Sequence, residues 1–330
     1  MEEETVVETN RLGWRAACLV AALAATLPAA AQTYPVKPVR MVVGFSAGGA
    51  TDIVARAIGQ NLHQAFGQPV IVDNRPGAAS NIAADHVAKS PPDGYTLFMG
   101  SISLANNATL YSNLPYNALR DLAPIVHVTN TPFMLCVHPS IPVKSVKELV
   151  AFAKARPGQV QYGTAGNGSG AHLFTELFAS MAGIKMQAIP YKGAAPAVND
   201  LVGGQLAFVF DNVIGMVPLH KAGKLRCLAA SSRSRSPIAP DIPTMQEAGI
   251  AGYVADAWFG LFAPAGTPAA VIERVNAEVN RAMQAPAIRN RFETLGCEPA
   301  GGSAAAFGAY FKSEIEKWGK VIRSAGVRLQ

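Results

Sequence analysis

A glycine-rich turn near the start of the chain carries the residue types best suited to binding a ligand through its backbone. It reads Gly44-Phe45-Ser46-Ala47-Gly48-Gly49-Ala50-Thr51-Asp52, after an apolar run and before an amphipathic run. Gly48 and Gly49 would let a ligand approach the backbone, and Thr51 or Asp52 is suited to cap the helix start. The N–H groups and dipole of a helix N-terminus favour a carboxylate or a phosphate. Alone, the turn predicts an anion site and an empty strand-to-helix connection about equally.

A second turn of the same kind lies further along the chain. It reads Tyr162-Gly163-Thr164-Ala165-Gly166-Asn167-Gly168-Ser169-Gly170-Ala171-His172, again between a strand-like and a helix-like run. If two such helix N-termini face each other across a cleft, they could hold both ends of a dicarboxylate. The pair therefore favours an anion-binding cleft that closes around its ligand.

An enzymatic alternative starts from the same residues, because Gly44, Ser46 and Gly48 match the Gly-x-Ser-x-Gly elbow of α/β-hydrolases. It is weakened because no oxyanion-hole loop precedes this first strand. The candidate bases, His172 and His220, also lack an evident acid partner.

Metal chemistry and redox chemistry find little support. No Lys-Ser/Thr follows the first glycines, so the turn is not a nucleotide P-loop. His172 and Glu176 could share a metal, but no third ligand is near and a hydrogen bond between them on one helix face is the better interpretation. Cys136, Cys227 and Cys297 have no zinc or C-x-x-C spacing, and we expect buried free thiols, no metal and no cofactor.

The N-terminal segment is typical of an export signal. Arg11 and Arg15 precede an apolar run that is too short to span a bilayer, and Pro28-Ala29-Ala30-Ala31 predicts cleavage before Gln32. Removing residues 1–31 lowers Lys and Arg from 28 to 26 and Asp and Glu from 22 to 18, so the net charge rises from +6 to +8. A mildly cationic, periplasmic protein favours anionic ligands. No basic run with interleaved aromatics indicates nucleic-acid binding.

Strand-like and helix-like runs alternate along most of the chain, which predicts an α/β fold with parallel strands covered by helices. Strands are expected at 39–45, 69–73, 95–100, 160–163, 186–190 and 207–210, and helices at 52–66, 82–88, 171–181, 195–201, 268–283, 287–295 and 303–325. Two apolar runs, 122–128 and 133–137, are separated by a break at 129–132 and form one crossing between lobes. The return crossing is 253–264. We expect a first lobe of residues 33–132 plus 256–330, and a second lobe of residues 133–255.

An ordered set of segments makes the chain resemble a known family. The segments are Tyr34-Pro35, Pro38-Val39-Arg40, Gly48-Gly49-Ala50-Thr51-Asp52, Val72-Asp73-Asn74-Arg75-Pro76-Gly77-Ala78, Pro91-Pro92-Asp93-Gly94-Tyr95-Thr96-Leu97, Gly166-Asn167-Gly168-Ser169, His172-Leu173, Pro190-Tyr191-Lys192-Gly193, Pro196-Ala197, Asp200-Leu201, Gly203-Gly204, Pro243-Thr244, Glu247-Ala248-Gly249 and Pro264-Ala265-Gly266-Thr267-Pro268. They run through nearly the whole chain after the signal. In them the chain resembles the Bug, or TctC-like, family of periplasmic receptors of tripartite tricarboxylate transporters.

The resemblance implies a periplasmic-binding-protein-like (Venus flytrap) fold, with two mixed-sheet α/β lobes joined by crossing strands. It also implies capture of a carboxylate mainly by backbone amides and ordered waters at the first glycine-rich turn. The implied ligand-binding residues are Phe45, Ser46, Ala47, Gly48, Gly49, Asp52, Ser80, Asn81, Ser101, Thr164, Ala165, Asn167, Ser169, His172, Tyr191, Lys192 and Asp211.

Two departures from the family pattern bear on which acid fits. The family commonly has Pro or Ala-Pro before the paired glycines, where this chain has Ser46-Ala47. It often has Gly-Gly-Asn after Arg-Pro-Gly, where this chain has Ala79-Ser80-Asn81. Added bulk or hydroxyl groups at these positions would change the preferred anion.

These observations predict a monomeric, exported receptor that binds a mono- or dicarboxylate, catalyses nothing and works with membrane transporter subunits. The alternatives are a serine hydrolase that uses Ser46, and a sensor or assembly partner without a transporter.

Overall fold

The computed structural model describes residues 34–324 and 327. The expected export signal, residues 1–31, lies outside the described residues. Contacts divide the chain into residues 1–36 and residues 37–330, and every element below belongs to the second unit. In the part of the chain that is described, no helix is both long enough and apolar enough to cross a membrane.

A mixed sheet, sheet A, forms around the first predicted strands. Its order is β2-β1-β3-β9-β4, with β10 also paired to β4. The first three strands are parallel and β9 runs antiparallel to β3. The bounds are β1 Val39–Val43, β2 Val70–Asn74, β3 Thr96–Ser101, β4 Leu122–Val137, β9 Asp256–Pro264 and β10 Glu298–Pro299.

A second sheet, sheet B, is built on the far half of β4. Parallel strands β5, β6 and β7 are joined to β4 through β7, and β8 pairs with β4 as well. The bounds are β5 Gln161–Thr164, β6 Gln187–Pro190, β7 Phe208–Asn212 and β8 Arg226–Ala230.

Strand β4 belongs to both sheets and corrects the predicted break at 129–132. It is one strand of 16 residues. Thr131 and Pro132 pair with β9, whereas Phe133 pairs with Asn212 in β7. Pro132 therefore lies where the strand changes partners, a position at which a residue without an N–H is tolerated.

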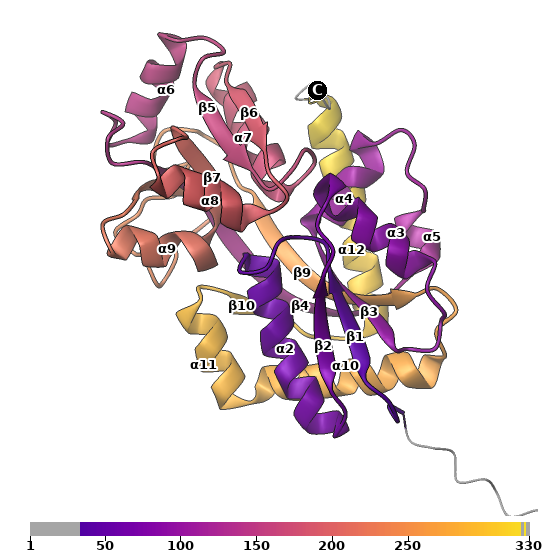
Figure 1. Cartoon of the computed structure of the whole chain (residues 1–330). Coiled ribbons are helices and arrows are strands. Elements are labelled where there is room, and N and C mark those ends of the chain that lie inside the picture. Colours follow the sequence, from indigo (N-terminus) through magenta and orange to yellow (C-terminus); the bar gives the residue numbers. More distant parts are fainter. Residues whose placement is uncertain (1–33, 325–326, 328–330) are drawn as a thin grey trace, which may run out of the picture. The chain divides into compact units, whose positions relative to one another are not determined.

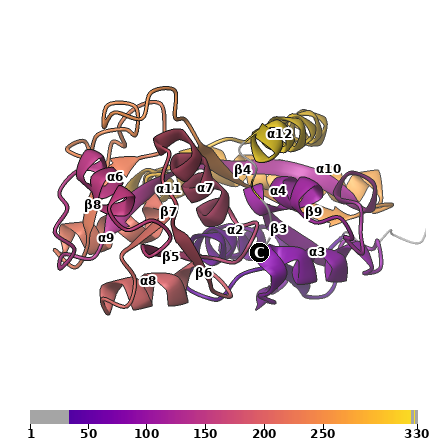
Figure 2. The ribbon, with the colours of Figure 1, turned by 90° about the horizontal axis from the view of Figure 1, so that it is seen from above.

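Helices lie against both sheets, as alternation of strands and helices requires (Figures 1 and 2). The bounds are α2 Ala50–Phe66, η1 Ala78–Ser80, α3 Asn81–Ala88, α4 Ile102–Leu110, α5 Ala118–Asp121, α6 Val146–Lys154, α7 Gly170–Ala182, α8 Ala194–Val202, α9 Val213–Lys221, α10 Ala269–Gln284, α11 Pro286–Thr294 and α12 Ala304–Ser324. Each predicted helix is present within two residues of its expected bounds over the described positions. Helices α4, α5, α6 and α9 were not predicted.

Helix α12, yellow in Figure 1, packs against strand β9 of sheet A and against α7, a helix next to sheet B. The ring centroid of Phe311 lies 5.8 Å from that of Trp258 and 5.1 Å from that of Phe262, both on β9. Near its other end, Trp318 stacks on Phe174 of α7 at 5.1 Å between ring centroids. Burial of such aromatic rings is worth about 2–3 kcal/mol each, so α12 contributes to holding the two sheets in one core.

A disulfide joins Cys136 of β4 to Cys227 of β8, so the expectation of free thiols is wrong for this pair. The two residues are 91 positions apart in sequence but face each other in the antiparallel register. Cys297 is a buried free thiol, as expected, and burial raises its pKa to about 12.

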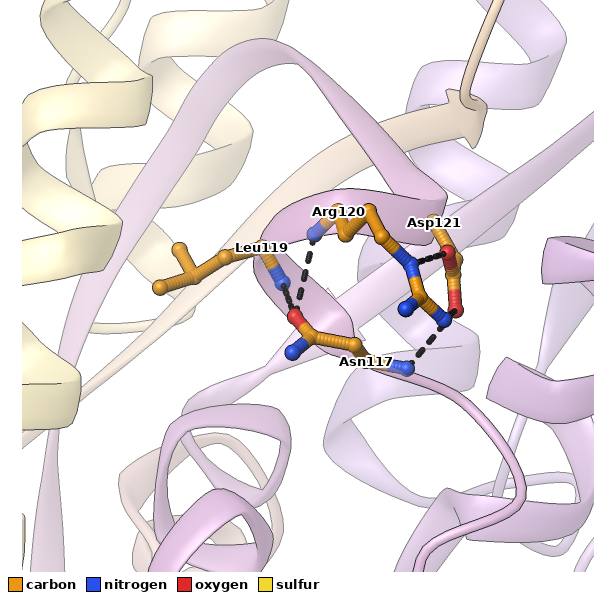
Figure 3. Close-up of polar contacts among 4 residues, drawn as sticks. All are labelled: Asn117, Leu119, Arg120 and Asp121. Carbon is orange, nitrogen blue, oxygen red and sulfur yellow. Dashed lines mark hydrogen bonds and ion pairs between the residues drawn. The ribbon is translucent and has the colours of Figure 1, made fainter.

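The short helix α5, which is not part of a glycine-rich turn, has its N-terminus capped by a side chain (Figure 3). The Asn117 side chain accepts hydrogen bonds from the N–H groups of Leu119 and Arg120. The Asp121 carboxylate accepts from Arg120 and from the N–H of Asn117, and these bonds lower its pKa to about 2. The Leu119 side chain points away from this network and is 50% exposed.

Candidate functional site

A narrow cavity lies where the N-termini of helices that cover the two sheets converge. It has a volume of about 40 Å³. Among the described residues, five helix N-termini contribute to its wall, each with the dipole's positive end toward the cavity. The contributing residues are Gly49, Ala50 and Thr51 at α2; Ser101, Ile102 and Ser103 at α4; Ser169, Gly170 and Ala171 at α7; Ala194 at α8; and Asp211 and Asn212 at α9.

Strands and one turn complete the wall with mainly apolar groups, namely Phe45, Phe133, Ala165, Ala257 and Phe259. No Lys, Arg or His side chain is among the lining residues that the structure describes. An anion in this cavity would therefore be stabilised by peptide dipoles and N–H groups rather than by a cationic side chain.

The first glycine-rich turn presents the start of α2 without a side-chain cap. Gly49 is the N-cap residue, and no side chain of the described chain bonds to the first N–H groups of the helix. Asp52, the third helical residue, instead reaches back and accepts from Gly48 N–H at 3.0 Å and from Arg56 at 2.9 Å. The expected cap by Thr51 or Asp52 is thus corrected, because the helix begins two residues earlier than predicted.

The charge of Asp52 is held in place by this arrangement. Burial would raise its pKa, but hydrogen bonds from Arg56, Gly48 N–H and Asn74 outweigh burial and lower it. Asp52 therefore stays ionised. It stabilises the turn through its hydrogen bond from Gly48 N–H and does not line the cavity.

The turn between β2 and α3 supports the first glycine-rich turn. A Cβ on Gly44 would lie 2.7 Å from the backbone of Ser80, so only glycine fits there. Ala78, Ala79 and Ser80 all have left-handed backbone conformations, with φ of 46°, 48° and 78°. Asn81 is buried and accepts from Asn107 and Tyr116 at 2.9 and 2.7 Å. Ser80 and Asn81 thus lie behind the cavity rather than in its wall.

The second glycine-rich turn is closed by more side chains than the first. Ser169 is the N-cap of α7 and its hydroxyl accepts from His172 N–H at 3.3 Å. His172 Nδ1 accepts from Gly168 N–H at 3.3 Å, so this imidazole is neutral. Burial lowers the pKa of His172, opposed by the charge of Glu176. The Glu176 carboxylate accepts from Tyr162, which replaces the expected hydrogen bond between His172 and Glu176.

Loops of the two sheets touch on either side of the cavity. On one side, Ser46 N–H donates to the carbonyl of Lys192 at 3.2 Å. On the other, Tyr111 OH donates to the carbonyl of Asn167 at 2.8 Å and Asn106 Nδ2 donates to that of Gly168 at 3.3 Å. These bonds join the first glycine-rich turn to the loop before α8, and the second glycine-rich turn to the α4 region.

The structure brings some of the expected ligand-binding residues together and leaves others behind the turns. In the cavity wall are Phe45, Gly49, Ser101, Ala165, Ser169 and Asp211. A second cavity of about 250 Å³, which shares Ala165, includes Asn167, Tyr191 and Lys192. Outside both walls are Ser46, Ala47, Gly48, Asp52, Ser80, Asn81, Thr164 and His172. Their role in binding stays a prediction.

Sequence reasoning missed two kinds of wall residue. Ala50 and Ala171 lie inside the two quoted turns but were not named as ligand-binding residues. Ser103 follows the named Ser101 by two positions, so counting the whole first turn of each helix would have found all three. Phe133 and Phe259 come from strands, and no local pattern marks them as lining a cavity.

The hydrolase alternative has no geometric support at Ser46. Its hydroxyl oxygen is buried and has no hydrogen-bond partner among the described residues. A serine nucleophile needs a base within hydrogen-bond reach, and His172 is engaged with Gly168. Among the described residues, no cluster of three His, Cys, Asp or Glu side chains could hold a metal ion.

Comparison with known sequences gives one family and close relatives. The model of the family described as tripartite tricarboxylate transporter family receptor, TctC, matches residues 54–327. Protein BugT of Bordetella pertussis is 40% identical over 305 residues, which cover 92% of this chain and 94% of BugT.

Solved structures show the same fold over nearly their whole length. Rpa4515 of R. palustris, solved with adipate, has a TM-score of 0.87 and 38% identity, covering 89% of this chain and 99% of that one. The periplasmic binding protein BugD has a TM-score of 0.87 and 32% identity, covering 90% and 100%. MatC of Rhodopseudomonas palustris, solved with malate, has a TM-score of 0.85 and 31% identity, covering 88% and 100%.

Proposed function

Because the chain belongs to the family of tripartite tricarboxylate transporter receptors, we propose that it binds a small organic carboxylate in the cavity between its two sheets. The family and the periplasmic-binding-protein-like fold class expected from the sequence are both confirmed. Adipate and malate are bound by the similar Rpa4515 and MatC. They are the first candidates for this chain.

The observation that carries the proposal is the convergence of five helix N-termini on one cavity without a cationic side chain, within the described residues. Such a site stabilises one or two carboxylate groups by dipoles and N–H donors. The wider second cavity, which adjoins the first at Ala165, gives room for the remainder of an elongated acid.

The test is calorimetric titration of the chain without residues 1–31 with adipate, malate and the uncharged diamide of adipic acid. We expect at least one acid to bind and the diamide not to bind, because the diamide carries no charge for the dipoles to stabilise. At a ligand concentration of 100 times Kd, the bound acid stabilises the fold by about 2.7 kcal/mol, which raises Tm by several degrees. Binding of neutral sugars alone would overturn the proposal.

A matched pair of variants locates the site. Ala50→Asp places a carboxylate at the first position of α2, in the cavity wall. Ala269→Asp makes the same change at the first position of α10, which is exposed and away from the cavity. Acidic residues at helix starts favour the helix, so both variants should fold. We expect only Ala50→Asp to abolish binding of the acid.

We infer further that the protein is exported, with residues 1–31 removed, and passes its ligand to membrane subunits. Mass spectrometry of the protein from a periplasmic extract should find Gln32 as the first residue. Deletion of its gene should abolish uptake of the bound acid, whereas a sensor would alter gene expression and leave uptake intact. The lobe boundaries 33–132 plus 256–330 and 133–255, catalytic inactivity and a monomeric state are parts of the same proposal.

A further inference from the structure

Asp211 is the single ionisable side chain among the described residues that line the cavity. It is the penultimate residue of β7, opposite Met134 of β4, and is 7% exposed. An acid in the wall of an anion site is unexpected, because two carboxylates in a dry cavity repel each other strongly.

Among the residues that the structure describes, no cation compensates Asp211. Burial raises its pKa to about 7, and only the backbone N–H of Asn212 acts in the other direction. Ionisable groups on the surrounding segments are His172 and Glu176 on α7, Lys192 and Asp200 at α8, His220 and Lys221 on α9, and Asp256 on β9. None of them contributes to the shift at Asp211. His172 and Glu176, the two on α7, are engaged with Gly168 and Tyr162.

The neighbouring Asn212 also lines the cavity, and its side-chain amide has a donor that no described protein group uses. Asn212 is 2% exposed, and its Nδ2 has no hydrogen-bond partner among the described residues. Its Oδ1 accepts from Thr131 Oγ1 and from Ile214 N–H, which fixes the orientation of the amide. The amide therefore offers an N–H donor that is held in place before the ligand arrives.

Resting on the proposed function, we propose that Asp211 takes up a proton from solvent when a carboxylate binds, and in its acid form donates a hydrogen bond to the ligand. No covalent bond to the ligand forms or breaks. The alternative is an ionised Asp211 that accepts a hydrogen bond from a ligand hydroxyl or ammonium group. The first arrangement fits a wall that otherwise supplies donors to an anion, and it predicts that release is easier at higher pH.

The experiment is calorimetric titration with adipate and malate at about pH 7 to 9, where both acids are fully ionised. Repeating it in buffers with different heats of ionisation measures the protons taken up on binding. We expect the wild-type protein to take up nearly one proton per ligand at about pH 8, and its affinity to fall nearly tenfold for each pH unit above that.

Asp211→Asn has the same shape but cannot titrate, and its amide still offers an N–H donor. We expect it to bind adipate with no proton uptake and with an affinity that does not change over this pH range. Asp256→Asn is the matched control, because burial also raises the pKa of Asp256 although it does not line the cavity. The control should keep the wild-type proton uptake.

The outcomes separate this inference from the proposed function. Binding of adipate or malate without proton uptake by the wild-type protein overturns the role of Asp211 and leaves the carboxylate receptor intact. Proton uptake by the wild-type protein therefore tests the role of Asp211 even if Asp211→Asn does not fold. Tight binding of malate alone that Asp211→Asn abolishes at every pH would establish an ionised acceptor instead. Failure of the wild-type protein to bind any acid at any pH overturns the proposed function itself.

Discussion

In both glycine-rich turns a side chain of the following helix accepts a hydrogen bond from the turn's backbone, but the two side chains differ. In each, the third helical residue reaches back to the N–H of the residue before the N-cap: Asp52 to Gly48, and His172 to Gly168. The first uses an ionised carboxylate and leaves Gly49 as a cap without a side chain. The second uses a neutral imidazole and adds the hydroxyl of Ser169.

This difference divides the work between the turns. At the start of α2 the N-cap Gly49 has no side chain to accept from the first N–H groups, so under the proposed function they are open to a ligand. The start of α7 gives one N–H to Ser169, so it is more rigid and offers fewer donors. We therefore expect the first turn to contribute more to anion binding, and the second more to positioning.

The glycines before the two caps should give the largest difference. Both have positive φ, but a Cβ on Gly168 would lie 2.4 Å from the buried Oδ1 of Asn107, whereas one on Gly48 would be 4.0 Å from its nearest neighbour. Left-handed strain costs about 1–2 kcal/mol in each case. We expect Gly48→Ala to lose about 1 kcal/mol of unfolding free energy and Gly168→Ala about 3 kcal/mol. Urea denaturation measures both, and equal losses would mean that Asn107 moves freely.

The two closures should also respond differently to pH. Because the folded pKa of His172 lies below its ordinary value, its contribution to stability is complete above about pH 6.5 and is lost as the pH falls below it. Asp52, with a lowered pKa, contributes above about pH 4. Between about pH 6.5 and 5, the free energy of the local opening that exposes the Gly168 N–H should fall by up to 1.4 kcal/mol per pH unit. The corresponding free energy for the Gly48 N–H should change little. Amide hydrogen exchange, corrected for intrinsic rates, resolves the two, and His172→Gln should remove the dependence at Gly168.

Exchanging the caps tests the division of work. Ser169→Ala should cost about 1 kcal/mol of stability. Gly49→Ser should change stability by only a few tenths of a kcal/mol, but weaken acid binding about threefold to tenfold, because the new hydroxyl competes for N–H groups of α2. An unchanged Kd for Gly49→Ser would show that these N–H groups do not hold the ligand.

The smallest effect is expected behind the first turn. Ala79→Gly relieves left-handed strain of about 1–2 kcal/mol and adds about 0.4–1 kcal/mol of unfolded-state entropy, so the net gain should be about 0.5 kcal/mol. Ala88→Gly, at the end of α3 with ordinary helical geometry, is the control and should lose up to about 1 kcal/mol. Thermal denaturation of the pair would contradict the strain argument if both variants lost stability equally.

Alternation along the chain predicted the elements that a local pattern determines. The strands around the two turns and helices such as α2, α7 and α10 have one apolar face and clear boundaries. Helix α4 was missed because it begins directly after β3, with no turn residue between Ser101 and Ile102. Helix α9 was missed because it contains Gly215 and Pro218, residues that usually argue against a helix.

The remaining features depend on contacts between distant residues. The Cys136–Cys227 disulfide needs the register of β4 and β8, which no spacing in the sequence reveals. The roles of Asp52 and His172 as closures likewise follow from where each helix begins. At α2, the start two residues earlier than predicted makes Asp52 the third helical residue, from which its side chain reaches back to Gly48 N–H.

The sharing of β4 has a consequence for dissecting this protein. Residues 122–132 complete one sheet and residues 133–137 complete the other, so no single cut leaves each half with its full complement of strands. A fragment that carries only the glycine-rich turn 162–172 would expose an open edge of sheet B to solvent and to other chains. We therefore expect the two halves to fold and unfold as one cooperative unit, so that neither half alone would make a working receptor.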